Sequence, residues 1–106
     1  MSKIALLEQY LRDSPQDPFL HFAMAKEYEK LGDWELSLNK YLHLVREHPD
    51  YVGTYYHLGR LYMHLDKASE ARATVNAGIA CAEKLDDRHS ASELEELLAQ
   101  IESEED

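Results

Sequence analysis

The most constraining feature of this chain of 106 residues is an internal repeat, marked by Pro15 and Pro49, which stand 34 residues apart. Placing position n beside position n+34 pairs apolar side chains with apolar ones and small with small. The pairs include Met24 with Leu58, Ala25 with Gly59, Tyr28 with Tyr62, Ser37 with Ala71, and Tyr41 with Val75. A fixed period of about 20 to 50 residues is typical of solenoids, in which each unit buries its apolar face against its neighbours. The period therefore predicts an all-α array of helical hairpins.

Capping residues and helix breakers predict about six helices. Apolar spacing in residues 3–13 indicates a first helix, and Asp17 with Pro18 starts a second helix that Gly32 ends. Asp33 then caps a third helix, which stops ahead of Pro49. The link of two or three residues between the second and third helices makes them antiparallel neighbours. The same hairpin is expected to recur from residue 52 to residue 84.

The last helix has a different pattern. Residues 85–89 indicate a connection, and Ser90 with Glu93 forms a capping box before a helix that carries one apolar stripe. An array needs such a helix at its end, because the outer side of a terminal cap must be polar. Residues 104–106 form an acidic tail, expected to be solvated, with an interaction tail as the alternative.

Composition excludes several classes of protein. The formal net charge of -10 argues against a nucleic-acid partner, because phosphate binding needs clustered lysine and arginine. No apolar run approaches the roughly 20 residues that span a bilayer, and residues 1–13 do not resemble a signal peptide, so we predict no membrane partner and a cytoplasmic location. The single cysteine, Cys81, lies among small residues and is expected to be buried.

The sequence contains no pattern that indicates catalysis, a cofactor or a metal site. We find no glycine-rich phosphate loop, no nucleophile elbow and no acid–base pair held in a cleft. Of the six histidines, His57 and His64 are seven residues apart and His43 and His48 five apart, and neither pair has the four-residue spacing of a helical zinc site. We therefore interpret the histidines as surface or packing residues and predict that the protein is not an enzyme.

Residues 18–51 and 52–85 each resemble a tetratricopeptide repeat, the 34-residue helix–turn–helix unit. The first copy carries the motif as Met24, Ala25, Tyr28, Gly32, Ser37, Tyr41 and Pro49, and the second as Tyr55, Leu58, Gly59, Tyr62, Ala71, Val75 and Gly78. Residues 1–14 resemble the second helix of an incomplete preceding repeat, and residues 87–103 a capping helix. His21, Leu44 and Glu83 depart from the family's pattern, which puts an aromatic, a small residue and a proline there. The resemblance implies a single domain of hairpins stacked as a short right-handed α-α superhelix.

The resemblance also implies a concave groove, lined by the first helix of each repeat, that binds a peptide or protein segment. By register, the groove residues would be Phe19, Phe22, Lys26, Glu29, Tyr56, His57, Arg60, Met63 and His64. Helical spacing alone places Phe22, Lys26 and Glu29 on one side of their helix, and Tyr56, Arg60 and Met63 on one side of theirs.

The charge of the ligand has two interpretations. Lys26 and Arg60 are one period apart and favour an acidic peptide or a C-terminal carboxylate; alternatively, both are solvated and paired with neighbouring carboxylates. Some family members bind acidic chaperone tails through a Lys and Asn set, but Phe22 and Lys26 occupy those positions here, so this form of the clamp is absent.

The leading hypothesis for function is a non-catalytic protein-interaction module. The alternative is a structural protein that self-associates as a homodimer, because two complete repeats fall below the roughly three that usually stabilise an array.

Overall fold

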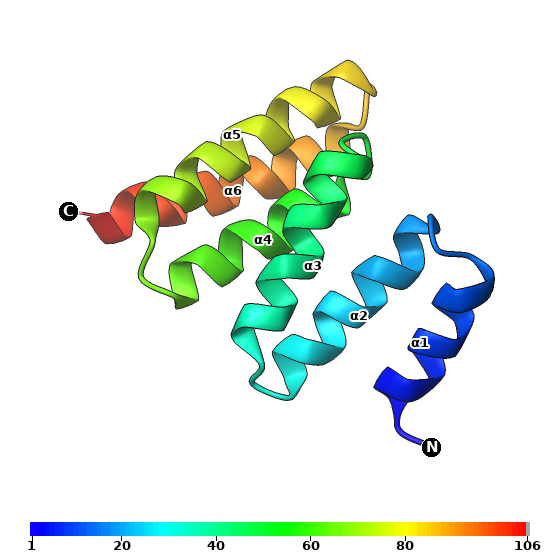
Figure 1. Cartoon of the computed structure of the whole chain (residues 1–106). Coiled ribbons are helices and arrows are strands. Elements are labelled where there is room, and N and C mark those ends of the chain that lie inside the picture. The colour runs from blue at the N-terminus through cyan, green and yellow to red at the C-terminus, as the bar shows by residue number, and fades with distance from the viewer. Residues whose placement is uncertain (106) are drawn as a thin grey trace. The chain divides into compact units, whose positions relative to one another are not determined.

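A computed structural model describes residues 1–105 and contains six α-helices along them (Figure 1). The helices are α1 (Lys3–Asp13), α2 (Pro18–Lys30), α3 (Trp34–Glu47), α4 (Gly53–His64), α5 (Ala68–Lys84) and α6 (Arg88–Glu105). Within the described residues there is no strand, which confirms the predicted all-α class. Asp106, the last residue of the predicted acidic tail, lies outside the described residues.

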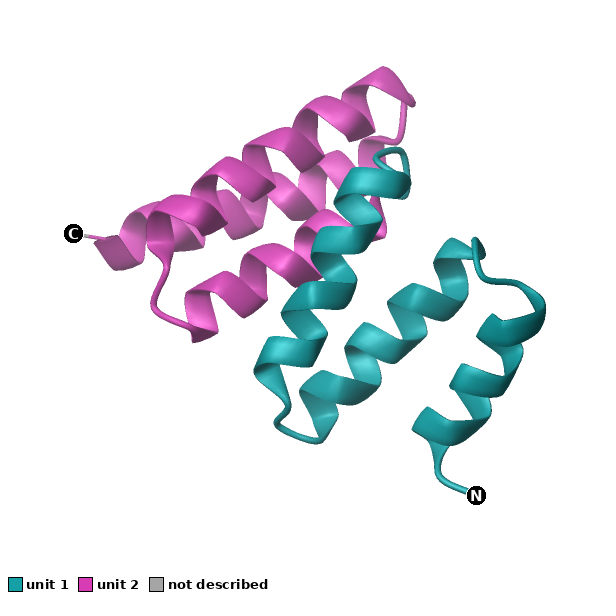
Figure 2. Ribbon diagram, in the orientation of Figure 1, with its two compact units in different colours: residues 1–51 teal, residues 52–106 magenta. Residues whose placement is uncertain are grey.

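The helices form two compact units, which Figure 2 shows in different colours. Unit 1 is Met1–Tyr51 and contains α1, α2 and α3, whereas unit 2 is Val52–Asp106 and contains α4, α5 and α6. Each unit has a buried apolar core of its own. That the two units act as one domain remains a prediction.

Unit 1 is built on the antiparallel α2–α3 hairpin, with α1 packed against α2. The side chain of Asp17 caps α2 by accepting a hydrogen bond from the backbone N–H of Phe19 at 3.0 Å. Gly32 takes a φ of 76° in the turn, the left-handed conformation that glycine tolerates best. The hairpin is joined inside by Ser37, whose hydroxyl donates to the carbonyl of Ala25 at 2.8 Å. The small residues of the repeat motif therefore let α2 and α3 approach closely.

In unit 2, α5 packs against both α4 and α6, and α4 also contacts α6. Two glycines permit this packing. A Cβ added to Gly59 would lie 2.6 Å from Cγ2 of Val75, and one added to Gly78 would collide with the Cβ of Tyr55. The turns that precede α5 and α6 place Asp66 and Asp86 in the left-handed region, where aspartate is tolerated better than most residues.

The start of α6 differs from the sequence prediction. The helix begins at Arg88, and the carboxylate of Asp87 accepts hydrogen bonds from the backbone N–H of Ser90 at 3.0 Å and from its hydroxyl at 2.7 Å. The predicted capping box starting at Ser90 is therefore wrong, because Asp87 supplies the cap one turn earlier and Ser90 is a donor within the first turn.

At its other end, α6 includes Glu104 and Glu105, two of the residues predicted to form a solvated tail. Arg72 of α5 forms an ion pair with Glu105, in which its Nε and Nη2 each donate a hydrogen bond to the carboxylate. This two-point contact holds the last turn of α6 against α5.

Cys81, on α5, also differs from its prediction. Its side chain is half-buried, whereas that of its neighbour Ala82 is buried.

Candidate functional site

In unit 1, the predicted groove residues lie on α2 at helical spacing. Phe19 is 61% exposed, and Lys26 is exposed as well. Phe22 is half-buried, with its ring centroid 6.2 Å from that of Tyr41 and 5.6 Å from that of Tyr51. The ring of Phe22 thus contributes to the packing of unit 1, while Phe19 presents apolar area to solvent. Glu29, the fourth predicted residue of this face, is half-buried.

In unit 2, the predicted residues lie on α4, and three of them are in contact. The ring of Tyr56 packs edge-on against His57 with centroids 5.4 Å apart. The guanidinium carbon of Arg60 lies 6.0 Å from the centroid of the Tyr56 ring, which is within cation–π range. Arg60 and His64 are exposed, and Met63 is half-buried. Tyr56, His57 and Arg60 therefore form a cluster on α4, and the groove that the sequence predicts remains a prediction.

A hollow of about 300 Å³ lies between α4 and α6. Tyr56 lines it from α4, and the other lining residues come from α6: Glu93, Glu96, Leu97, Ala99 and Gln100. Leu97 is 6% exposed, and its Cδ2 would be 3.4 Å from a Cβ at Gly59, so it fills the space over that glycine. The hollow therefore combines an aromatic ring and a buried leucine with exposed carboxylates.

Sequence reasoning missed the contribution of α6. The sequence predicts only a terminal cap with a polar outer side there, and it places Glu93 in a capping box. The signal that could have found this contribution is the spacing of Glu93, Glu96, Leu97 and Gln100, which places all four on one side of a helix. The sequence alone does not show which neighbouring helix this side of α6 faces, because that depends on how α6 packs against α4 and α5.

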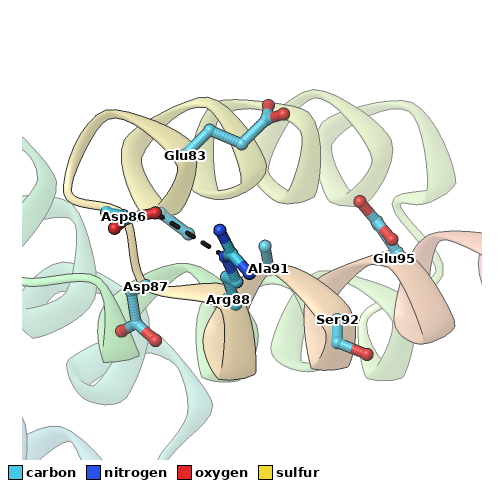
Figure 3. Close-up of a pocket in the computed structure, with 8 residues that line it drawn as sticks. Glu83, Asp86, Asp87, Arg88, Ala91, Ser92 and Glu95 are labelled. Carbon is cyan, nitrogen blue, oxygen red and sulfur yellow. Dashed lines mark ion pairs between the residues drawn. The ribbon is translucent and has the colours of Figure 1, made fainter.

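A second hollow, of about 410 Å³, lies at the turn between α5 and α6 (Figure 3). Figure 3 shows Glu83 on α5, Ser92 and Glu95 on α6, and the ion pair between Asp86 and Arg88 at the turn. Asp86 and Arg88 pair at 3.8 Å, with side chains 87% and 94% exposed. Glu95 lines this hollow and does not line the hollow beside Tyr56.

Three of the six histidines meet in unit 1. The Nε2–H of His21 donates to the carbonyl of Pro15 at 2.8 Å, and Lys40 Nζ lies 3.4 Å from Nδ1 of the same ring. The ring of His21 lies 4.3 Å from that of His43, which in turn lies 6.4 Å from that of His48. His21 is buried, where the family's pattern has a large aromatic. The sequence did not indicate this cluster, because His21 comes from α2 whereas His43 and His48 come from α3 and its C-cap.

Burial governs the ionisation of this cluster. Burial lowers the pKa of His43, and the neighbouring His21, Arg46 and Lys40 lower it further, against an opposing effect of Glu47. Burial also lowers the pKa of the Lys40 ammonium, with an opposing effect of Glu8 on α1. The cluster therefore disfavours added positive charge.

Residues 1–105 show neither a cluster that could bind a metal nor a helix that could cross a membrane. No three or more His, Cys, Asp or Glu side chains in this range come together in a way that could hold a metal ion. No described helix has both the length and the apolar character needed to cross a membrane.

Comparison with solved structures gives close matches in fold. A tetratricopeptide repeat domain protein from Salinibacter ruber, known from its crystal structure, is 40% identical to this chain with a TM-score of 0.78, and the match covers 81% of this chain and 97% of that one. The TPR2B domain of yeast Sti1, in a complex with pHsp70, is 15% identical with a TM-score of 0.87, covering 95% of this chain and 81% of that one. PcrH, in complex with the chaperone binding region of PopD, is 13% identical with a TM-score of 0.86, covering 97% and 78%. The sequence matches no family model and no curated protein.

Proposed function

Because the chain belongs to the tetratricopeptide repeat family, we propose that it is a non-catalytic module that binds a segment of another protein. The finer proposal is that the segment lies along the exposed side chains of α2 and α4. The TPR2B domain of yeast Sti1 and PcrH share this fold, and each was solved in complex with part of another protein. These complexes support binding of protein segments as the use of the fold.

The observation that carries the proposal is the cluster of Tyr56 and Arg60 on α4 beside the hollow between α4 and α6. Tyrosine and arginine are enriched among the residues that dominate binding energy at protein interfaces. Tyr56 is already held against His57 and Arg60, so it would lose little rotamer freedom on binding. A partly exposed aromatic ring at the edge of a hollow is a suitable anchor for an apolar side chain.

The proposal is tested by selecting ligands from a library of random peptides with the full chain. We expect the Tyr56→Ala and Arg60→Ala variants each to bind the selected peptides about tenfold more weakly, or worse, because each removes part of the anchor. Tyr10→Ala is the control, since Tyr10 is another solvent-accessible tyrosine, 50% exposed, and lies on α1, outside the predicted face. Circular dichroism should show the same helicity for all the variants.

Participation of α2 is tested with Phe19→Ala and Lys26→Ala rather than with a change at Phe22. Truncating Phe22 would loosen its contacts with Tyr41 and Tyr51, so lost binding could reflect lost packing. If the library yields no ligand, or if binding survives Tyr56→Ala and Arg60→Ala together, the proposed function is wrong.

A further inference from the structure

We propose that the hollow between α4 and α6 receives a lysine or arginine side chain of the bound segment, an inference that rests on the proposed function. The partner is thus a protein segment with a basic residue next to an apolar one. The basic residue would direct its charge to Glu93 and Glu96 and lay its methylene groups against Tyr56 and Leu97.

The first argument is the state of the two carboxylates. Glu93 and Glu96 are exposed, stand one turn apart on α6, and both line the hollow. Glu93 has only His89 nearby, with 3.4 Å between Oε1 and Nε2, while Glu96 makes no ion pair or hydrogen bond with any residue in the range 1–105. Two carboxylates that no lysine or arginine of their own unit neutralises would gain charge-assisted hydrogen bonds from an incoming cation.

The second argument is the apolar part of the hollow. Lysine and arginine bury their methylene groups along apolar surfaces while the charged group stays near water. Tyr56 and Leu97 supply such a surface directly beside the carboxylates. Neither a bare cation nor a wholly apolar side chain would use both halves of the hollow.

The third argument is the charge of the surroundings. Of the 21 acidic residues of the chain, twelve lie in residues 52–106, against five lysines and arginines. Helix α6 has six glutamates, and its only lysine or arginine is Arg88. Such an acidic surface raises the encounter rate of a basic segment and repels an acidic one. Arg60 lies 6.0 Å from the centroid of the Tyr56 ring but does not line the hollow.

This inference gives the ligand the opposite charge to the one that Lys26 and Arg60 alone would favour. Those two residues come from α2 and α4, whereas the carboxylates that decide the charge of this hollow come from α6. An acidic side chain placed here would face Glu93 and Glu96 and lose solvation without gaining a partner.

The test begins with the peptides that the full chain selects from the random library. We expect lysine or arginine at one position of the aligned peptides. In synthetic copies, replacing that residue by norleucine, which keeps the chain length without the charge, should weaken binding about tenfold, and replacing it by glutamate should weaken it further. The affinity should also fall as salt is raised, because an exposed pair is screened.

Matched variants of α6 then locate the contact. Glu96→Gln and Glu93→Gln should each weaken binding of the lysine peptide several-fold and leave binding of the norleucine peptide unchanged. Glu95→Gln removes the same charge from the same helix but lies at the other hollow, so it should have little effect. Glu96→Lys should restore binding of the glutamate peptide.

The two proposals fail in different ways. Peptides that bind through Tyr56 but show no basic preference, or that bind equally well to wild type and to Glu96→Gln, would overturn the basic side chain and leave the interaction module standing. Binding that survives Tyr56→Ala and Arg60→Ala together would overturn the proposed function itself.

Discussion

At His43, the packing of unit 1 opposes a positive charge, and this makes the stability of the unit depend on pH. The pKa of His43 is lowered from its ordinary value of 6.5 by burial and then by His21, Arg46 and Lys40. A base whose pKa is lower in the folded than in the unfolded state binds protons preferentially when unfolded. Its contribution to stability is therefore complete above pH 6.5 and is lost as the pH falls below that value.

We expect the free energy of unfolding to decrease between about pH 7 and pH 5, and the variant His43→Phe to make that decrease shallower. Phenylalanine keeps an aromatic ring beside His21 but cannot take up a proton. Urea unfolding followed by circular dichroism at several pH values measures the slope, and hydrogen exchange of residues 18–48 locates it in unit 1. His89→Gln, on the exposed side of α6, is the control. An unchanged slope in His43→Phe would rule out this account.

At the scale of the helix, α6 has an unfavourable distribution of charge at its C-terminus. Its last turn contains Glu102, Glu104 and Glu105 and no basic residue, although the partial negative charge of the helix C-terminus favours cations. Arg72, which lies on α5, offsets part of this negative charge by pairing with Glu105. We expect Glu104→Lys to raise the stability of the chain by about 0.3–1 kcal/mol, measured as a higher thermal midpoint.

The same substitution within the middle of α6 provides the comparison. Glu95→Lys changes the net charge equally but lies away from the helix terminus, so it should raise the midpoint less. Equal gains from both variants would mean that net charge, and not the helix terminus, limits the stability of α6.

The helices also show what the sequence could predict. The 34-residue period was sufficient for the all-α class. The breakers Pro15, Gly32 and Pro49 were sufficient for the first hairpin, because helix breakers act on the few residues beside them. The start of α6 was missed because Asp87 and Ser90 both have capping side chains, and the choice between them depends on the turn that Asp86 makes. In the candidate site, the repeat register predicted residues on α4, and their role in binding remains a prediction. The α6 wall and the histidine cluster were not predicted, because they depend on which helix faces meet.

For the whole molecule, the net charge of -10 should make stability depend on salt. Like charges repel more strongly in the folded chain than in the expanded unfolded chain, so screening favours the folded state. Exposed ion pairs such as Arg46–Glu47 and Lys67–Glu70 oppose this effect, because salt weakens them, but each contributes little. We expect the thermal midpoint to rise between about 0.01 M and 0.15 M salt, as the Debye length falls from about 30 Å to about 8 Å.

The same measurement at two protein concentrations distinguishes an interaction module from a self-associating protein. The midpoint of a homodimer rises with protein concentration, because association stabilises only the folded state, whereas the midpoint of a monomer does not change. Salt would also strengthen a homodimer of this acidic chain by reducing repulsion between copies. We expect a midpoint that rises with salt and is independent of concentration. A midpoint that rises with both would favour the homodimer, and a midpoint that falls with salt would show that the ion pairs outweigh the net charge.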